Sequence, residues 1–139
     1  AGEINRGMPE WVVNKLCAAL DERGRAIVGS RILVLGLAYK KNVGDTRESP
    51  AVALMELLVQ RGAIVEYSDP HVPVFPRMCE HHFELGSVAL SPETIQSYDA
   101  VLLATNHDAF DYPLIQKHAR LIVDTRGVYL ATAEKVVKA

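Results

Sequence analysis

The residues best suited to chemistry lie in one stretch, RILVLGLAYKKNVGDTRESP, which begins at Arg31. After an apolar run, this stretch places Lys40, Lys41 and Arg47 close to an asparagine amide and a glycine. A lysine supplies a point charge and an arginine a two-pronged donor, and both suit a phosphate. Ser49-Pro50 then reads as a helix start, with serine as N-cap and proline at the first helical position. A strand, a cationic loop and a helix N-terminus together predict a phosphate-binding loop.

This loop lacks the standard nucleotide-binding fingerprints. After Gly36 the next glycine is Gly44, so GxGxxG is absent, and GxxxxGK[ST] does not occur either. The sequence therefore argues against an NAD or ATP site of the usual kind and favours a loop that holds phosphate through side chains. The alternative is that the lysines are solvated surface residues, which composition alone favours.

The elements that must position this loop alternate between strands and helices. Continuous apolar runs, typical of strands buried on both faces, predict strands at 32–38, 63–67, 100–105 and 121–124, with a short one at 87–90. Helical spacing, N-caps and prolines predict helices that begin near residues 9, 50, 92 and 113. This order predicts a doubly wound α/β fold: a mainly parallel sheet with helices on both faces, Rossmann-like but without the GxGxxG fingerprint.

Three polar segments follow predicted strands and are expected to meet. They are Tyr39-Lys40, residues 105–108 (TNHD) and residues 124–127 (DTRG). In a parallel sheet the carboxyl ends of the strands share one edge, and ligands bind there near the point where strand order reverses. The sequence therefore predicts a polar site at this edge.

Composition excludes several classes of function. The 139 residues predict one domain, and 17 acidic against 15 basic residues give a net charge of -2. That balance gives no electrostatic case for nucleic-acid binding, so any anion site must be local. No apolar run approaches the ~20 residues of a membrane span, so no membrane partner is expected. Cys17 and Cys79 do not form CxxC and predict a reduced, cytoplasmic protein.

Several separated motifs resemble one known family. GLAYKKNVGDTRESPA, SDP, DAVLLATNHDAF and VDTRG occur in the order seen in the C-terminal, UDP-binding domain of the UDP-glucose/GDP-mannose dehydrogenase family. INRGMPEWVV resembles the helix that leads into this domain from the family's central domain. Since the chain also opens without Met, we expect a piece of a longer protein, with residues 1–28 as the lead-in helix and 29–139 as the UDP-sugar-binding domain.

The resemblance implies an NAD-dependent parent enzyme that oxidises the C6 alcohol of a nucleotide sugar to a carboxylate. In the family, an N-terminal Rossmann domain binds NAD, and a central domain carries the catalytic cysteine in a GGxCxP-like segment and mediates dimerisation. Neither Cys17 in NKLCAAL nor Cys79 in RMCEHH resembles that segment. We therefore expect this chain to bind UDP or a UDP-sugar without turnover and without a cofactor of its own. The parent is expected to be a homo-oligomer, and this chain a monomer or weak dimer.

The family pattern carries over to particular residues of the predicted edge. Tyr39-Lys40 matches an aromatic–lysine pair that contacts the nucleotide, and Arg126 matches an arginine that contacts the nucleotide sugar. Arg47 matches the arginine that reaches across the cleft to NAD on the other domain. KKNVGDTRESP resembles the enzymes that act on UDP-N-acetylhexosamines, with UDP-glucose as the next candidate.

The remaining polar groups have plainer interpretations. Nothing shows the convergent geometry of a zinc site around Cys79, His81 and His82, so no metal is expected. Residues 106–108 (NHD) are read either as part of the nucleotide-facing edge, or as a helix cap through the asparagine or the aspartate.

Three aspartates and the single tryptophan are also assigned structural roles. Asp45, Asp69 and Asp124 follow strands or precede helices and are expected in turns and caps. Trp11 has helical spacing and is expected to anchor the core or an interface between domains.

Together these observations predict the UDP-sugar-binding domain of an NAD-dependent nucleotide-sugar 6-dehydrogenase. The alternative is a free-standing, flavodoxin-like module that senses a nucleotide or a phosphate, which composition and fold fit equally well. A hydrolase built around His107 has no nucleophile to support it.

Overall fold

A computed structural model of the chain describes residues 2–37, 50–72, 86–126, 128–129 and 136–138. Its strands form one all-parallel sheet in the order β2-β1-β3-β4-β5. The strands are β1 (Arg31–Leu35), β2 (Ile64–Ser68), β3 (Ala100–Leu103), β4 (Ile122–Asp124) and β5 (Val136–Lys138). The helices are α1 (Gly2–Glu22), α2 (Pro50–Gln60), α3 (Pro92–Gln96) and α4 (Tyr112–His118).

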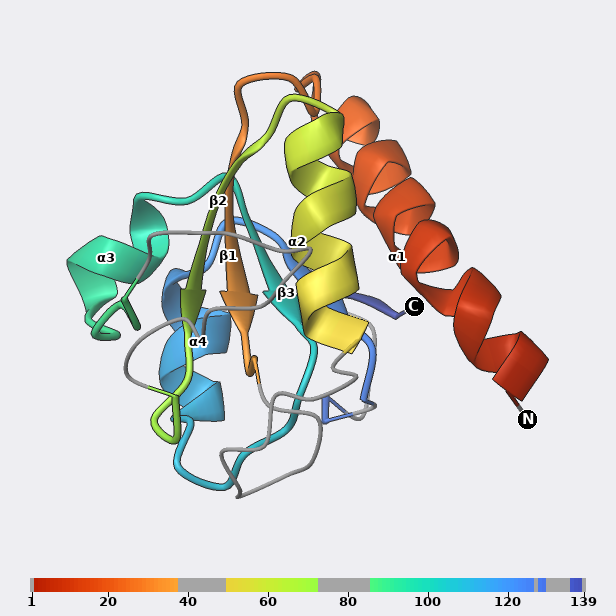
Figure 1. Ribbon diagram of the computed structural model, residues 1–139. Helices are drawn as coiled ribbons and strands as arrows, with labels where there is room; N and C mark the ends of the chain where they lie inside the picture. The colour runs from red at the N-terminus through yellow and green to blue at the C-terminus, as the bar shows by residue number, and fades with distance from the viewer. Residues whose placement is uncertain (1, 38–49, 73–85, 127, 130–135, 139) are drawn as a thin grey trace.

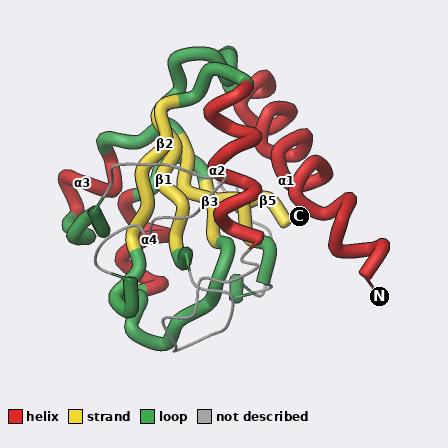
Figure 2. The backbone as a smooth tube through the Cα atoms, viewed as in Figure 1, coloured by secondary structure: helices red, strands yellow, loops and turns green. Residues whose placement is uncertain are grey.

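Helices cover both faces of the sheet, as Figures 1 and 2 show. α1 and α2 lie side by side on one face, where Leu16 and Met55 pack in one apolar cluster with Val34 of β1. α3 and α4 cover the opposite face, where Ile115 packs in a second cluster with Leu33. Successive residues of β1 thus enter different layers, because side chains along a strand point alternately to its two faces. The predicted doubly wound α/β fold is confirmed.

The helix boundaries follow from local sequence signals. Ser91 accepts a hydrogen bond from the Thr94 amide at the start of α3, as the Ser-Pro signal predicts. At the end of α2, Gly62 has a φ of +93°, and the amide of Ala63 donates to the carbonyl of Leu58 at 3.0 Å. Glycine adopts this left-handed conformation without a Cβ clash, which closes the helix and turns the chain into β2.

The order of strands fixes where a ligand can bind. From β1 the chain crosses to β2 at one border, then returns to the other side of β1 as β3. Strand order therefore reverses between β1 and β3, and the carboxyl ends of these two strands border the crevice in which doubly wound proteins hold ligands.

Several sequence-based expectations were wrong in detail. Residues 87–90 do not form a strand; the Val88 amide donates to the Tyr67 carbonyl at 2.9 Å outside any ladder. β5 was not foreseen. Trp11 has an exposed fraction of 54%, so its side chain does not lie in the core of this chain, and its other predicted role, as an anchor between domains, stays a prediction.

Within the described ranges, no helix combines the length and apolar character that crossing a membrane requires.

The helix α1 packs against the same core as β1. The division into a lead-in helix and a binding domain between residues 28 and 29 stays a prediction.

Candidate functional site at the carboxyl edge of the sheet

The candidate site starts at the close approach of the β1 and β3 ends. Gly36, directly after β1, has a φ of +87°, and a Cβ built on it would lie 2.5 Å from the Cβ of Thr105. Its amide donates to the Ser68 carbonyl at 2.9 Å, and the Leu35 carbonyl accepts from the amide of Ala104 at 2.9 Å. Only glycine fits here, and as a result the ends of β1, β2 and β3 are held together where strand order reverses.

A buried aspartate–histidine pair lies beneath this edge. Asp69 follows β2, His107 follows β3, and both have an exposed fraction of 0%. The Nε2 atom of His107 lies 2.9 Å from Oδ2 of Asp69. The same Oδ2 atom accepts from the amide of Leu37 at 2.7 Å, and Oδ1 accepts from the amide of His71 at 2.7 Å. The carboxylate thus connects the segments that follow three strands.

Two tyrosines continue these contacts towards β4. The hydroxyl of Tyr112 donates to the His107 carbonyl at 2.5 Å, and the hydroxyl of Tyr129 donates to the Tyr112 carbonyl at 2.9 Å. The amide of Tyr129 donates to Oδ2 of Asp124 at 2.9 Å. Asp124 has an exposed fraction of 1%, so a second buried carboxylate lies at the end of β4.

Burial changes the acid–base behaviour of these tyrosines. Burial, with a smaller contribution from the charges of Asp108 and Asp124, raises the pKa of Tyr112 to about 12. Burial and the nearby Asp124 also raise the pKa of Tyr129. Both hydroxyls therefore stay protonated and act as hydrogen-bond donors at neutral pH.

Arg126 supplies a cation at the rim of the site. Its side chain is exposed, and its Nε atom donates to the Ala104 carbonyl at 2.7 Å. Its backbone amide donates to Oδ1 of Asp124 at 2.9 Å. Among the described residues, its two terminal nitrogens have no hydrogen-bond partner. One bond thus orients the guanidinium and leaves its two-pronged end for an anion such as a phosphate.

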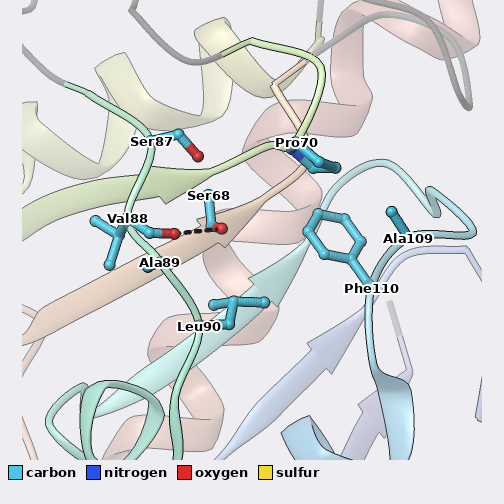
Figure 3. A pocket seen from close by; sticks show the side chains of 8 residues that line it. All are labelled: Ser68, Pro70, Ser87, Val88, Ala89, Leu90, Ala109 and Phe110. Carbon is cyan, nitrogen blue, oxygen red and sulfur yellow. Dashed lines mark hydrogen bonds between the residues drawn. The ribbon is translucent and has the colours of Figure 1, made fainter.

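An apolar hollow lies beside the charged part of the edge, on the face covered by α3 and α4. It has a volume of about 310 Å³ and is lined by Pro70, Val88, Leu90 and Phe110 among others. Figure 3 shows Phe110 facing Val88 and Leu90 across it, with the Ser68 hydroxyl bonded to the Val88 carbonyl. None of its lining residues is charged, so the hollow is not where a diphosphate would be neutralised.

The structure tests the predicted site residues unevenly. Of the residues assigned to ligands, Arg126 is described and lies at the predicted edge, while Tyr39, Lys40 and Arg47 lie outside the described residues. The segments after β3 and β4 do converge, since the hydroxyl of Thr125 donates to the Leu103 carbonyl at 2.6 Å.

The structure contradicts the predicted capping role of the NHD segment, while the predicted nucleotide-facing role of Asn106 and Asp108 stays a prediction. His107 is fully buried, so its side chain cannot contact a ligand directly, whereas Asp108 is exposed. The N-cap of α4 is Asp111, which accepts from the amide of Leu114. The prediction that Asn106 or Asp108 caps this helix is therefore wrong.

The predicted turn roles hold for two of the three aspartates. Asp69 and Asp124 each accept from the amide two residues later, which is an Asx turn. Asp45 lies outside the described residues, as do Cys79, His81 and His82. In the part of the chain that the structure describes, no group of three potential ligands could hold a metal ion.

Sequence reasoning missed the pairing of Asp69 with His107. The role of each residue was predicted only from the residues next to it, whereas the two partners lie 38 positions apart in the sequence. The available signal was that an acid directly follows one apolar strand and an imidazole comes a few residues after another, and that the carboxyl ends of these strands must share an edge.

Residues 33–131 match the UDP-glucose/GDP-mannose dehydrogenase family, UDP binding domain. Together with the parallel sheet and its polar carboxyl edge, this match shows that the chain belongs to that family. The rival interpretation as an unrelated sensing module is not favoured.

Individual relatives agree with this assignment. The UDP-N-acetyl-D-mannosamine dehydrogenase of Methanococcus maripaludis is 34% identical over 110 residues, which covers 79% of this chain and 23% of that protein. The NDP-N-acetyl-D-galactosaminuronic acid dehydrogenase of Ralstonia solanacearum is 31% identical over 136 residues, covering 94% and 30%. The solved UDP-D-ManNAc dehydrogenase of Pyrococcus horikoshii matches with a TM-score of 0.76 and 26% identity, covering 98% and 31%. The chain thus spans about a quarter to a third of the length of these relatives.

Proposed function

We propose that this domain binds the UDP part of a nucleotide sugar at the carboxyl edge of its sheet. The observation that carries the proposal is Arg126, whose guanidinium is fixed by one bond to the Ala104 carbonyl, while its terminal nitrogens have no hydrogen-bond partner among the described residues. Tyr39 and Lys40 come shortly after β1 in the sequence, so they are the partners we assign to the nucleotide. Two or three separated cations at strand ends are the donor set that a diphosphate requires.

We also propose that the domain works within an NAD-dependent 6-dehydrogenase, which oxidises the C6 alcohol of the sugar to a carboxylate. The support is that the relatives named as dehydrogenases are three to four times as long as this chain. Several act, by name, on N-acetylated hexosamines linked to UDP, so a UDP-N-acetylhexosamine is the proposed substrate. The full-length protein is proposed to be a homo-oligomer whose main contacts lie outside this domain.

The sequence after β1 does not fit an NAD site of the Rossmann type, because no GxGxxG motif follows that strand. We therefore assign the cofactor mainly to another domain of the full-length protein. Arg47 is the one residue of this chain that we assign to it.

The proposed cellular compartment follows from the amino-acid sequence and not from the candidate site. With two cysteines and no CxxC pair, the chain fits a reducing compartment. We accordingly propose a cytoplasmic protein.

Thermal unfolding with UDP, UDP-N-acetylglucosamine, GDP and NAD in parallel tests the proposal. A ligand at a hundred times its dissociation constant stabilises the folded state by ~2.7 kcal/mol, which raises Tm by several degrees. We expect stabilisation by the two uridine nucleotides alone. A shift with GDP of the same size, or none with either uridine nucleotide, would contradict a uridine site in this domain.

Replacement of Lys40 tests its assignment separately. Lys40→Ala should weaken UDP binding by ~1.5–3 kcal/mol, the range for hydrogen bonds to charged groups. Calorimetric titration measures the change, and the neighbouring Lys41→Ala is the matched control. Unchanged affinity in Lys40→Ala would remove Lys40 from the site.

A further inference from the structure

Two backbone amides at the carboxyl edge are each held by a buried carboxylate. The amide of Leu37, the last described residue before the segment with Lys40, donates to Oδ2 of Asp69 at 2.7 Å. The amide of Arg126 donates to Oδ1 of Asp124 at 2.9 Å. Asp69 and Asp124 have exposed fractions of 0% and 1%, so neither carboxylate meets solvent or a ligand directly.

A continuous series of contacts joins these two carboxylates through the interior. Asp69 bonds to the ring of His107, and the His107 carbonyl accepts from the hydroxyl of Tyr112. The Tyr112 carbonyl accepts from the hydroxyl of Tyr129, whose amide donates to Asp124. The aromatic rings add a second set of contacts. The ring of Phe110 lies between those of His107 and Tyr112, with centroid separations of 5.6 and 6.1 Å.

We propose that Asp69, His107, Tyr112, Tyr129 and Asp124 form a positioning network for the nucleotide site. The network sets the direction in which the chain leaves β1 and β4, and so places Arg126, the described cation that follows β4. This inference rests on the proposed function, because the cations are assigned there to a diphosphate.

Chain geometry shows why the two amides matter. Leu37 is the last described residue after β1, so its held amide fixes the direction in which the chain leaves that strand. Arg126 is itself the residue whose amide is held, and its Nε atom is bound to the Ala104 carbonyl at the end of β3. A shift of the Arg126 amide therefore moves a residue that is proposed to bind the phosphate.

Burial argues for a role beyond stability. A buried ionic group costs desolvation energy, and well-packed apolar residues of similar volume often replace such a pair without loss of stability. Here the carboxylates instead satisfy backbone amides at the two points where the proposed ligand-binding segments begin. Apolar residues in place of the two carboxylates would not hold these amides, so they would not orient the segments.

The test uses variants at His107 in the full chain. His107→Leu removes the ring nitrogen that meets Asp69, whereas His107→Gln keeps a side-chain nitrogen in a similar place. For each protein, UDP affinity is measured by calorimetry and amide hydrogen exchange is measured at Leu37 and Arg126. Stability is measured by denaturant unfolding, so that affinity is compared only between folded proteins. The amide of Ile64, which donates to the Ser30 carbonyl at the opposite edge, is the internal control.

We expect His107→Leu to weaken UDP binding by about tenfold, by analogy with the lower end of what loss of an orienting outer-shell partner costs at metal sites. Exchange should accelerate at Leu37 more than at Ile64, and His107→Gln should restore both properties. Wild-type affinity in folded His107→Leu, or Leu37 exchange no faster than that of Ile64, would overturn the network. Absence of UDP binding by the wild-type chain would instead contradict the proposed function, and the exchange data would still show whether the network holds Leu37.

A milder pair of variants covers the case in which His107→Leu does not fold. Tyr129→Phe removes only the hydroxyl that donates to Tyr112, and Tyr98→Phe removes a hydroxyl that donates to Glu66 near the other edge. We expect Tyr129→Phe to weaken UDP binding and to accelerate exchange at Arg126, and Tyr98→Phe to do neither. Equal UDP affinity in the two variants would count against the network.

Discussion

The two edges of the sheet use the same kinds of charged group in different ways. At the amino edge, Arg25 pairs with Asp99 at 2.9 Å and Arg31 with Glu66 at 3.3 Å, and the arginine side chains have exposed fractions of 52% and 42%. At the carboxyl edge, Asp69 and His107 are fully buried and bonded to each other, and Asp69 also holds the backbone amides of Leu37 and His71. Exposed pairs are screened by water and contribute little, whereas an uncompensated buried charge is costly. The comparison indicates that geometry is fixed most firmly where the ligand is proposed to bind.

Removing the buried carboxylate should give the largest effect. Asp69→Ala leaves His107 and the amide of Leu37 without that partner, and breaking a buried pair costs about 3–5 kcal/mol of unfolding free energy. At the amino edge, Asp99→Ala removes a bond to the amide of Arg31 and should cost about 1.5–3 kcal/mol. Denaturant unfolding measures both, and a larger loss in Asp99→Ala would reverse the comparison.

The second-largest effect is expected from glycine substitutions, which separate the cost of steric crowding from the cost of backbone conformation. Gly36→Ala at the carboxyl edge adds a Cβ that meets Thr105, and should cost about 2–5 kcal/mol from overpacking plus left-handed strain. Gly24→Ala at the amino edge is matched in φ, at +73° against +87°, but its Cβ meets nothing within 4 Å. It should cost about 1–2 kcal/mol, which is the strain alone. Equal unfolding free energies for the two variants would show that the ends of β1 and β3 are not in close contact.

High pH should weaken the fold through its buried tyrosines. Burial is the main cause that raises the pKa values of Tyr67, Tyr98 and Tyr112 to about 12 from 10.0. Between these two values the folded state keeps protons that the unfolded chain has lost, so the unfolding free energy should fall as pH rises through this window. Below pH 10 the contribution should be fully present. Phenolate absorbance measured alongside unfolding tests this, and folded-state titration of all five tyrosines near pH 10 would contradict it.

The smallest effect belongs to the exposed amino-edge pair. Arg25→Ala should cost at most about 1 kcal/mol, because the arginine of its ion pair with Asp99 is half exposed to solvent. The loss should shrink further at high salt, since exposed charges are screened. A loss above 2 kcal/mol that salt does not change would mean that the two edges are alike.

The sequence predicted the order of elements better than it predicted the contacts at the site. Continuous apolar runs identified β1 and β3, and the Ser-Pro signal placed the start of α3, because burial and capping act over a few neighbouring residues. β5 was missed because it follows a stretch without clear periodicity, and it is defined by its pairing with β4.

The candidate site shows the same division between local and long-range information. The position of Arg126 at the edge followed from the polar ends of parallel strands. The burial of His107 did not, because it depends on Asp69 of another strand and on Phe110 packing against its ring. Local sequence cannot distinguish a polar residue that faces a ligand from one that orients its neighbours.

Titration of UDP into the wild-type chain, Arg126→Ala and Arg25→Ala tests the central claim most directly. Each variant removes one exposed arginine, at the carboxyl and the amino edge respectively. We predict that Arg126→Ala weakens UDP binding by about 1.5–3 kcal/mol, or roughly tenfold to a hundredfold, while Arg25→Ala binds like the wild type. Equal affinity for UDP in all three proteins would contradict a nucleotide site at the carboxyl edge.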